Sequence, residues 1–360
     1  MAKVYSRTLT LPDGRRKFFR AATVEEAERR RDEAREQIAR GMRVGDTTTV
    51  ADLARMWFDT YKKGQLHIRS EETIQGILDR YIIPRIGWMP VKDVLPVHIQ
   101  QVMVYVKNYS KSTQKKVLQN MKAIFTMAEE NGFIQRSPVR SNIKAKGADP
   151  EEKKPLTRAQ TEALLTAIRD TRAYTLVLVL LHAGLRIGEA LGLLWSDIDF
   201  DNGTISVKRS IVFTSDHPEG IINRNMKTDA AERTIPVPTF VTEHLLAEMR
   251  KSRSVYVFSM QNGRHLSSSS YRALWRLVET RTIGKTHTCR EFVERTLDFN
   301  VHPHLLRHTC ITRWFEAGLD VKEVQYLAGH ASPEITLGIY THYMAEERHK
   351  ETAEKIRAAN

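Results

Sequence analysis

The chain has 360 residues, which is too long for one typical domain, so we expect two or three. Its composition, 41% hydrophobic and 28% charged, is typical of a globular protein and excludes an intrinsically disordered one. The formal net charge of +13 favours a polyanionic partner, with a merely solvated basic surface as the alternative. The first 150 residues carry 28 Lys and Arg against 17 Asp and Glu, whereas the other 210 carry 28 against 26. We therefore expect the first part of the chain to hold a polyanion and the second to carry a site.

Two classes of protein are disfavoured by simple counts. The two cysteines, Cys289 and Cys310, are too few for a disulfide framework or a cysteine-rich metal site. Residues 1–20 contain no apolar segment of the kind that a signal peptide needs. The longest apolar run, Ala173–Leu185, is too short to span a bilayer and is expected to be a buried helix. We therefore expect a cytoplasmic protein.

Residues 1–45 are predicted to form a small module. Val4–Leu11 and Lys17–Ala21 flank the turn signal Pro12-Asp13-Gly14, which indicates a β-hairpin. Thr23-Val24-Glu25-Glu26 is a capping box and opens a helix that we expect to reach Gly41. The basic side chains on the hairpin would suit a DNA groove: Arg15, Arg16, Lys17 and Arg20. A module that docks on a protein partner is the alternative.

Residues 46–145 are predicted to be all-helical. Thr49 caps a first helix that runs to Lys63, Ser70 starts a second that ends before Pro84, and Pro96 opens a third. A long fourth helix starts at Ser112 and reaches Asn131-Gly132. Its apolar residues recur at helical spacing and are expected in the core: Leu118, Met121, Ile124 and Phe125. Lysines would give one side a basic stripe suited to phosphate contacts: Lys107, Lys111, Lys115, Lys116 and Lys122. The polar segment that follows predicts an interdomain linker at residues 146–155.

Residues 156–360 are predicted to combine helices with a small sheet. Thr157 precedes a helix, and after the turn Asp201-Asn202-Gly203 the segment Thr204–Phe213 alternates as one half-buried strand. Ile221–Asn223 and Arg233–Val237 are two further strands, and helices follow from Ser268. The expected fold class is α+β: a mainly helical domain with a small antiparallel sheet, preceded by an all-α domain and the hairpin–helix module.

Two candidate site residues carry charge in apolar surroundings. Arg186 follows Gly184 in an otherwise apolar helix, where an unpaired charge would be very costly. A core salt bridge to Glu189, one turn away, would explain it. Alternatively, Arg186 faces an anionic substrate and Glu189 orients it.

Several histidines follow in the last sixty residues. His304 and His308, four residues apart, could bind zinc from one helix face, but the Glu of a His-Glu-x-x-His motif is missing. Arg307 between them favours a phosphate pocket instead. Three further candidates have ordinary explanations when each is taken alone: a packed histidine at His330, a solvated turn lysine at Lys227 and a half-buried aromatic at Tyr340.

The order of these residues carries more information than any one of them. Arg-x-x-Glu, a turn lysine, His-x-x-Arg-His, Gly-His and Tyr-x-His together resemble the catalytic domain of the tyrosine recombinases, the phage-integrase family. The neighbouring segments are similar too: Ala183–Glu189, Leu193–Ile198, Arg233–Val237 and His304–Thr309. The resemblance covers residues 155–345 strongly. It extends more weakly to 46–145, as a core-site DNA-binding domain, and residues 1–45 are similar to the arm-site modules of mobile-element integrases.

The resemblance implies a role for each candidate. Arg186 and Arg307 would clamp the scissile phosphate, and Tyr340 would be the nucleophile. The remaining roles are general acid to the leaving 5′ oxygen for Lys227, assistance to proton transfer for His304, a hydrogen bond to the phosphate for His330, and support of the arginines from behind for Glu189. Tyr343 is a competing nucleophile, but Tyr340-Thr341-His342 fits the family pattern. Because the catalytic set is complete, the resemblance implies an active enzyme.

The implied chemistry needs no cofactor. Tyrosine, with an ordinary pKa of about 10, is a poor nucleophile at pH 7, so cationic groups and a proton acceptor must assist it. Arginine forks match the equatorial oxygens of the phosphoryl transition state. Attack leaves a 3′-phosphotyrosine and a free 5′-hydroxyl, so religation needs neither metal nor ATP. The sequence accordingly shows no Walker loop and no carboxylate cluster.

We therefore expect a site-specific DNA recombinase that integrates and excises a phage or transposon, acting as a homotetramer on double-stranded DNA at core and arm sites. An excisionase or a host DNA-bending protein would be a further partner, and no membrane is involved. The expected location is the bacterial cytoplasm, with the nucleoid. The tail Tyr343–Asn360 is expected to be an amphipathic helix, either docked on a neighbouring subunit or solvated.

Two other functions share part of this pattern. A type IB topoisomerase would use the same chemistry as a monomer, but the three-part layout with a small arm module argues against it. A non-catalytic DNA-binding regulator would keep only the fold, and the complete catalytic set argues against that.

Overall fold

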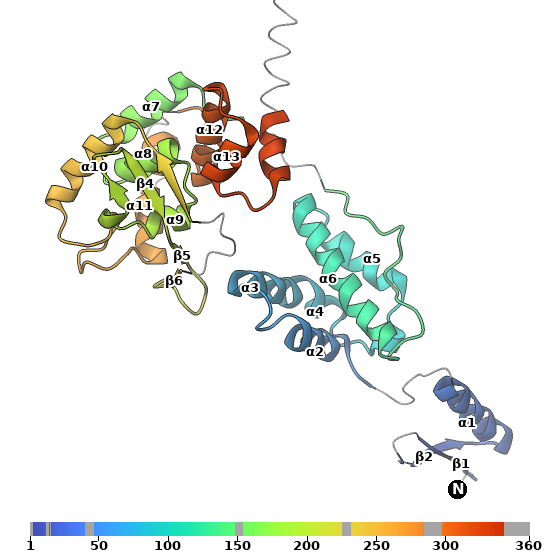
Figure 1. Cartoon of the computed structure of the whole chain (residues 1–360). Coiled ribbons are helices and arrows are strands. Elements are labelled where there is room, and N and C mark those ends of the chain that lie inside the picture. Colours follow the sequence, from blue (N-terminus) through green and yellow to red (C-terminus); the bar gives the residue numbers. More distant parts are fainter. Residues whose placement is uncertain are drawn as a thin grey trace, which may run out of the picture. The chain divides into compact units, whose positions relative to one another are not determined.

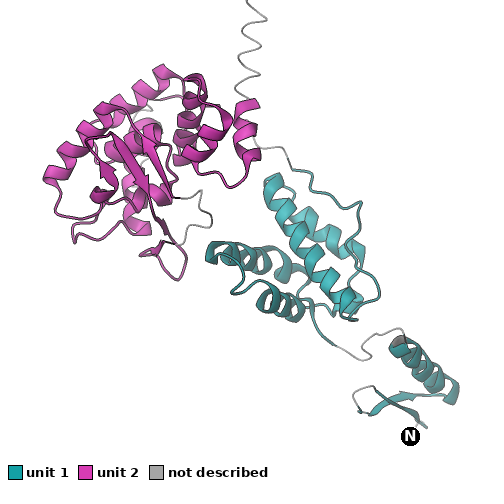
Figure 2. Ribbon diagram, viewed as in Figure 1, with its two compact units in different colours: residues 1–151 teal, residues 152–360 magenta. Residues whose placement is uncertain are grey.

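The computed structural model describes residues 3–11, 14, 16–39, 47–147, 154–224, 232–283 and 297–341. The chain divides into two compact units, Met1–Glu151 and Glu152–Asn360 (Figure 2). Helices dominate both units and the strands are short and antiparallel (Figure 1), so the predicted α+β class is confirmed. No helix in the described ranges is both long enough and apolar enough to cross a membrane.

The first unit begins with the predicted hairpin and helix. Strands β1 (Tyr5–Thr10) and β2 (Arg16–Ala21) pair antiparallel, and helix α1 (Val24–Ala39) packs on both. The cap is confirmed, because the hydroxyl of Thr23 accepts the Glu26 backbone N–H at 3.2 Å. Arg7 of β1 donates to Glu28 of α1 at 2.8 Å, which ties the hairpin to the helix. The expected helix end at Gly41 lies outside the described residues.

The rest of the first unit is the predicted helical domain. Its helices are α2 (Val50–Tyr61), α3 (Ile68–Ile77), α4 (Ile83–Ile86), α5 (Pro96–Tyr105) and α6 (Lys111–Glu130). Thr49 closes a capping box with Asp52 at the start of α2, as predicted. One core joins the five helices, and its largest fully buried side chains are Leu53, Ile82, Ile86, Ile99, Met121, Ile124 and Phe125.

Three predicted helix boundaries in this domain are wrong. The second helix begins at Ile68, and the chain stays helical past Pro84 through a π-helical turn, Leu78–Ile82, that leads into α4. Proline is tolerated there because the π-helical turn before it has already replaced the i→i−4 pattern: the Ile83 N–H bonds the Leu78 carbonyl, five residues back. The long helix is capped by Ser110, not Ser112: the Ser110 hydroxyl accepts the Thr113 backbone N–H at 3.2 Å.

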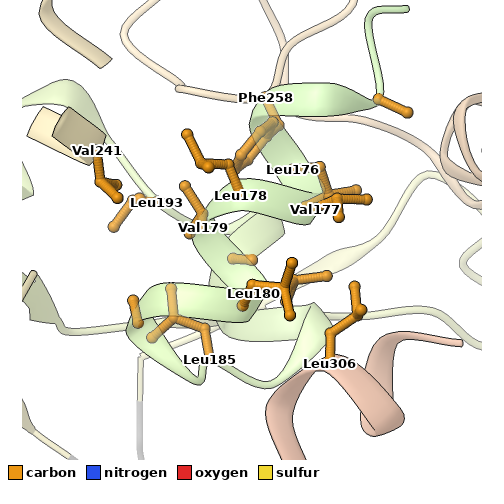
Figure 3. Close-up of a cluster of buried hydrophobic side chains, with 14 of the residues drawn as sticks. Leu176, Val177, Leu178, Val179, Leu180, Leu185, Leu193, Val241, Phe258 and Leu306 are labelled. Carbon is orange, nitrogen blue, oxygen red and sulfur yellow. The ribbon is translucent and has the colours of Figure 1, made fainter. Parts of the chain in front are cut away.

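The second unit is built around one apolar helix. This helix, α8 (Tyr174–Ala183), is buried along almost its whole length, as predicted, and Figure 3 shows its leucines and valines facing several other elements. Helices α7 (Arg158–Ile168), α10 (Thr239–Lys251) and α12 (Pro303–Glu316) pack against it. Helix α11 (Ser268–Ile283) packs on α7, and α13 (Val321–Ala328) packs on α12. Residues 333–341 form a further helix.

Two small sheets flank these helices. The order of the first is β3 (Ile198–Asp199), β4 (Thr204–Val207) and β7 (Arg233–Pro236); the second pairs β5 (Ser210–Val212) with β6 (Ile221–Asn223). The prediction of one strand over residues 204–213 is therefore wrong. The strand breaks at Lys208-Arg209, and the side chain of Arg209 pairs with the buried carboxylate of Asp197.

Candidate active site

Arg186 lies between two helices rather than inside one, so that part of its prediction is wrong. Helix α8 ends at Gly184, whose φ of +58° suits a residue without a Cβ, and Arg186 is the N-cap of the short helix α9 (Ile187–Leu191). The guanidinium donates Nη1 to Glu189 Oε1 at 2.8 Å and Nη2 to the Gly329 carbonyl at 2.6 Å. Its side chain remains 46% exposed, so the salt bridge and an outward-facing cation coexist.

Arg307 supplies a second guanidinium from α12. Its residue is only 2% exposed, and it donates Nη1 to the Gly184 carbonyl at 2.6 Å and Nη2 to the Ala328 carbonyl. Arg307 thus joins the end of α8 to the end of α13. Burial, and next the positive charge of Arg186, lower the pKa of Arg307 to about 9. The group stays protonated at neutral pH, with the carboxylate of Glu189 4.0 Å from its Nη1.

Glu189 is the carboxylate that these arginines share. It is buried, and besides Arg186 it pairs with Arg233 at 2.8 Å and lies 4.0 Å from Arg307. Burial alone would raise the pKa of Glu189. The hydrogen bond and charge of Arg233, together with the charges of Arg186 and Arg307, outweigh burial and lower the pKa to about 2. Glu189 is therefore ionised at any physiological pH.

Arg233 is a member of this cluster that the sequence did not single out. The sequence pattern places it at the start of a strand and in a segment similar to the family, without a role at the site, yet its guanidinium is fully buried and bonds Glu189. The alternation of the strand nevertheless indicates that Arg233 is buried. Successive side chains alternate between faces, so Arg233 shares the buried face of β7 with Ile235, and a buried arginine requires a carboxylate.

His330 follows the end of α13. Gly329 closes that helix with φ +61°, and the buried His330 places Nδ1 2.8 Å from the hydroxyl of Thr336. Burial, followed by the charges of Arg307, Arg186 and Arg233, lowers the pKa of His330 to about 4. The imidazole is therefore neutral at pH 7.

His304 and His308 both lie on α12 but differ in burial. His304 is exposed in the first turn and close enough to His330 to affect its charge, whereas His308 is half-buried. Among the described residues no three His, Cys, Asp or Glu side chains gather in a way that could hold a metal ion. Cys310, next to Gly184, is buried, and burial raises the pKa of its thiol to about 12.

Tyr340 lies in the helix formed by residues 333–341. It is half-buried, and its ring packs on Phe315 of α12 with centroids 5.2 Å apart. The same helix carries Thr336, the partner of His330. The structure therefore gathers Arg186, Glu189, Arg307 and His330 and places His304 and Tyr340 on adjoining elements. Lys227, His342 and Tyr343 lie outside the described residues.

Comparison with known proteins identifies the family of this chain. Residues 154–347 match the model of the phage integrase family, and residues 50–145 match the model of the phage integrase central domain. The chain is 26% identical to a tyrosine recombinase XerC-like protein of Caldanaerobacter subterraneus subsp. tengcongensis, over 92% of this chain and 89% of that protein. It is 27% identical to the transposase from transposon Tn916 of Enterococcus faecalis, over 65% of this chain and 59% of the transposase.

Solved structures give the same result. The Tn1549 transposon integrase in complex with a circular intermediate DNA superposes with a TM-score of 0.67 and 25% identity, over 81% of this chain and 94% of that chain. A lambda integrase tetramer bound to a Holliday junction shares the fold, with a TM-score of 0.58 and 15% identity over 93% of this chain and 94% of that chain. This chain belongs to the phage integrase family and is a tyrosine-type site-specific recombinase of the mobile-element kind, which cuts and rejoins DNA strands.

Proposed function

We propose that the cluster around Glu189 is the phosphate site of this recombinase, with Arg186 and Arg307 as the clamp. The observation that carries the proposal is the imbalance of charge. Three guanidinium groups surround one ionised carboxylate, which leaves two positive charges in a largely buried cluster. Such a site favours a scissile phosphodiester, and it favours even more the transition state, in which negative charge builds on the equatorial oxygens.

The remaining roles follow from chemistry and position. Tyr340 Oη forms the new bond to phosphorus while the bond to the 5′ oxygen breaks, and Lys227 protonates that leaving oxygen. His330 is neutral, and we assign its Nδ1 as the acceptor from Thr336, so that Nε2–H can donate to the phosphate. The phenol proton of Tyr340 leaves to solvent with the assistance of the exposed His304. Religation reverses these steps with the 5′-hydroxyl of another strand.

We also propose that the first unit holds DNA in two ways. Residues 46–145 would clamp the core site, residues 146–155 would link them to the catalytic domain 156–360, and residues 1–45 would bind an arm site. One face of the hairpin supports the last assignment, because hydroxyl, aromatic and arginine side chains lie opposite one another on it: Ser6 and Arg20, Thr8 and Phe18, Thr10 and Arg16. Arginine and hydroxyl groups are suited to phosphate and base contacts.

The assembly and the setting are part of the same proposal. A lambda integrase of this fold forms a tetramer on a Holliday junction, and we propose a homotetramer on DNA for this chain, with an excisionase or a DNA-bending protein as accessory. The two relatives described above come from bacteria, and we place the reaction at the nucleoid in the cytoplasm of a bacterium.

A suicide DNA substrate, nicked near the cleavage position, tests the nucleophile. The wild-type protein is expected to form a covalent 3′-linked adduct that migrates with the DNA on a denaturing gel. Tyr340→Phe should form none, because phenylalanine lacks the attacking oxygen, whereas the matched variant Tyr343→Phe should form the adduct normally. The reverse pattern would make Tyr343 the nucleophile. Adduct formation by Tyr340→Phe and Tyr343→Phe alike would exclude both.

A further inference from the structure

Arg233 has a fully buried guanidinium that contacts two elements of the site, α9 and α13, without reaching the surface of the protein. From the start of β7 it donates Nη2 and Nη1 to the two oxygens of Glu189, at 2.8 and 3.3 Å. It donates Nε to the Leu327 carbonyl, in the last turn of α13, at 2.7 Å. Since Arg186 caps α9 and His330 follows α13, one side chain holds the two elements on which the proposed phosphate ligands lie.

We infer that Arg233 is a positioning residue for DNA cleavage, which keeps Glu189 and the turn Ala328-Gly329-His330 in place around the phosphate. The inference rests on the proposed role of Arg186 and Arg307 as the clamp. Arg233 itself does not touch the DNA, since its side chain has no exposed surface. Its effect on the reaction passes through Arg186 and His330.

The turn after α13 is built against the Arg233 guanidinium. A Cβ added to Gly329 would lie 2.7 Å from Arg233 Nη1, closer than two such atoms can approach, and the φ of +61° also favours glycine. The Gly329 carbonyl accepts the hydrogen bond of Arg186. The Arg233 guanidinium therefore sets how closely the turn, and with it the partner of Arg186, approaches the cluster.

Arg233 also determines how much of the negative charge of Glu189 must be compensated by Arg186. A buried carboxylate must be compensated, and Arg233 does this from the buried side through both oxygens. Arg186 approaches the same carboxylate from the exposed side and is 46% exposed. With Arg233 present, Arg186 can turn part of its fork to a phosphate. Without Arg233, Arg186 would be the main compensation for Glu189 and would be a weaker phosphate ligand.

The loss of Arg233 should also change how the rate of DNA cleavage depends on pH. The charged groups facing Glu189 are Arg186 from its own helix, Arg233 from β7 and Arg307 from α12; His330 nearby is neutral. In Arg233→Gln the largest lowering influence on the pKa of Glu189 is gone, while burial still raises it. Glu189 should then take up a proton in mildly acidic solution, where the wild-type carboxylate stays ionised.

The test compares Arg233→Gln with Arg209→Gln in the full chain on the suicide substrate. Arg209 is a matched control in the same unit: it is mostly buried, pairs with the buried Asp197 and donates to the Gly192 carbonyl, at the end of α9 opposite Arg186. Single-turnover cleavage at saturating protein is measured from pH 5 to 9, with DNA affinity and thermal unfolding measured separately.

Arg233→Gln should cleave about 100-fold more slowly at pH 8. It should lose still more rate toward pH 5, and adding Glu189→Gln should abolish that acidic loss. Arg209→Gln should keep the wild-type profile.

Arg233→Lys separates charge from geometry and covers the case in which Arg233→Gln does not fold. The ammonium keeps Glu189 ionised but cannot bond two carboxylate oxygens and the Leu327 carbonyl together. We expect a roughly 10-fold slower rate, by misplacement of the clamp, and no acidic loss. Equal rates and pH profiles for Arg233→Gln and Arg209→Gln, or a wild-type rate for Arg233→Lys, would overturn the inference. Failure of the wild-type protein to form any adduct would instead overturn the proposed function.

Discussion

At the scale of single residues, burial and charge act against each other on Glu189. Burial favours the protonated carboxyl, whereas the hydrogen bond and charge of Arg233 and the charges of Arg186 and Arg307 favour the ionised form. The ionised form wins, and the pKa falls from 4.5 to about 2. A carboxylate whose pKa is lowered on folding stabilises the fold above its unfolded pKa, near 4.5, and this stabilisation is lost as the pH falls toward 2.

Glu189→Gln should remove this stabilisation together with its pH dependence. The variant leaves the buried Arg233 without its carboxylate, so we expect the free energy of unfolding at pH 7 to fall by about 3–5 kcal/mol. Between pH 4.5 and 2 the wild-type protein should lose stability relative to the variant, and the two should converge. Urea unfolding at several pH values measures this. Glu162→Gln, at an exposed position on α7, is the control and should follow the wild type. A constant gap between wild type and Glu189→Gln at all pH values would contradict the prediction.

The residues of the site differ in how far the sequence alone could identify them. Arg186 stands out because its charge occurs in apolar surroundings, whereas Arg307 and His330 are identified by the order in which the motifs follow one another. Arg233 could have been assigned to a buried face from the alternation of its strand, but its partner Glu189 lies 44 residues earlier in the chain. No local pattern specifies such a pair, since it forms only when β7 and α9 are packed together.

At the scale of elements, the predictions that depend on neighbouring residues are correct, and those that depend on more distant contacts are wrong. The caps at Thr23 and Thr49 and the turn at Gly203 depend on neighbouring residues, and the sequence predicted them. The break between β4 and β5 depends instead on the pairing of Arg209 with Asp197, twelve residues away. Continuation of the helix past Pro84 depends on a π-helical turn that periodicity does not reveal.

A hydrogen bond between Thr336 and His330 joins the helix that carries Tyr340 to the turn after α13. Thr336 is completely buried, lies one turn before Tyr340 and is bonded to His330 Nδ1 at 2.8 Å. Phe315 of α12 packs on the Tyr340 ring from another direction. The hydroxyl of Thr336 therefore has two consequences: it orients His330, and it fixes the helix of Tyr340 to the turn that follows α13.

Thr336→Val should slow cleavage without weakening DNA binding. Valine keeps the volume of the side chain but leaves His330 Nδ1 unsatisfied, at a cost of about 1–3 kcal/mol. We expect the single-turnover rate to fall about 10-fold or more while the dissociation constant for DNA is unchanged. Thr312→Val is the matched control, because Thr312 is also buried but its hydroxyl donates within α12, to the His308 carbonyl. Equal rates for the two variants would show that the hydrogen bond between Thr336 and His330 has no role in cleavage.

At the scale of the whole molecule, positive charge is distributed in two ways. The first 150 residues carry 11 more basic than acidic residues, by the counts of 28 and 17, and helix α6 exposes several lysines to solvent. The rest of the chain is nearly neutral but concentrates uncompensated charge at Glu189. Charge of the first kind attracts any DNA backbone, whereas charge of the second kind would act on the one phosphate proposed to bind there. We therefore expect affinity and catalysis to respond to different substitutions.

Salt dependence of DNA binding distinguishes these two kinds of charge. Lys115 and Lys122, two turns apart on the exposed side of α6, lie where both can contact phosphates of one duplex. Each lysine that neutralises a phosphate adds about 0.9 to the slope of log affinity against log salt, so Lys115→Ala/Lys122→Ala should reduce that slope by about 2. The cleavage rate at saturating protein should not change. Lys251→Ala/Lys322→Ala, at exposed positions in the second unit, should leave the slope as it is. The slope is measured by fluorescence anisotropy from 50 to 300 mM salt, roughly the range over which counterion release dominates. An unaltered slope in the α6 variant would mean that this helix faces away from the DNA.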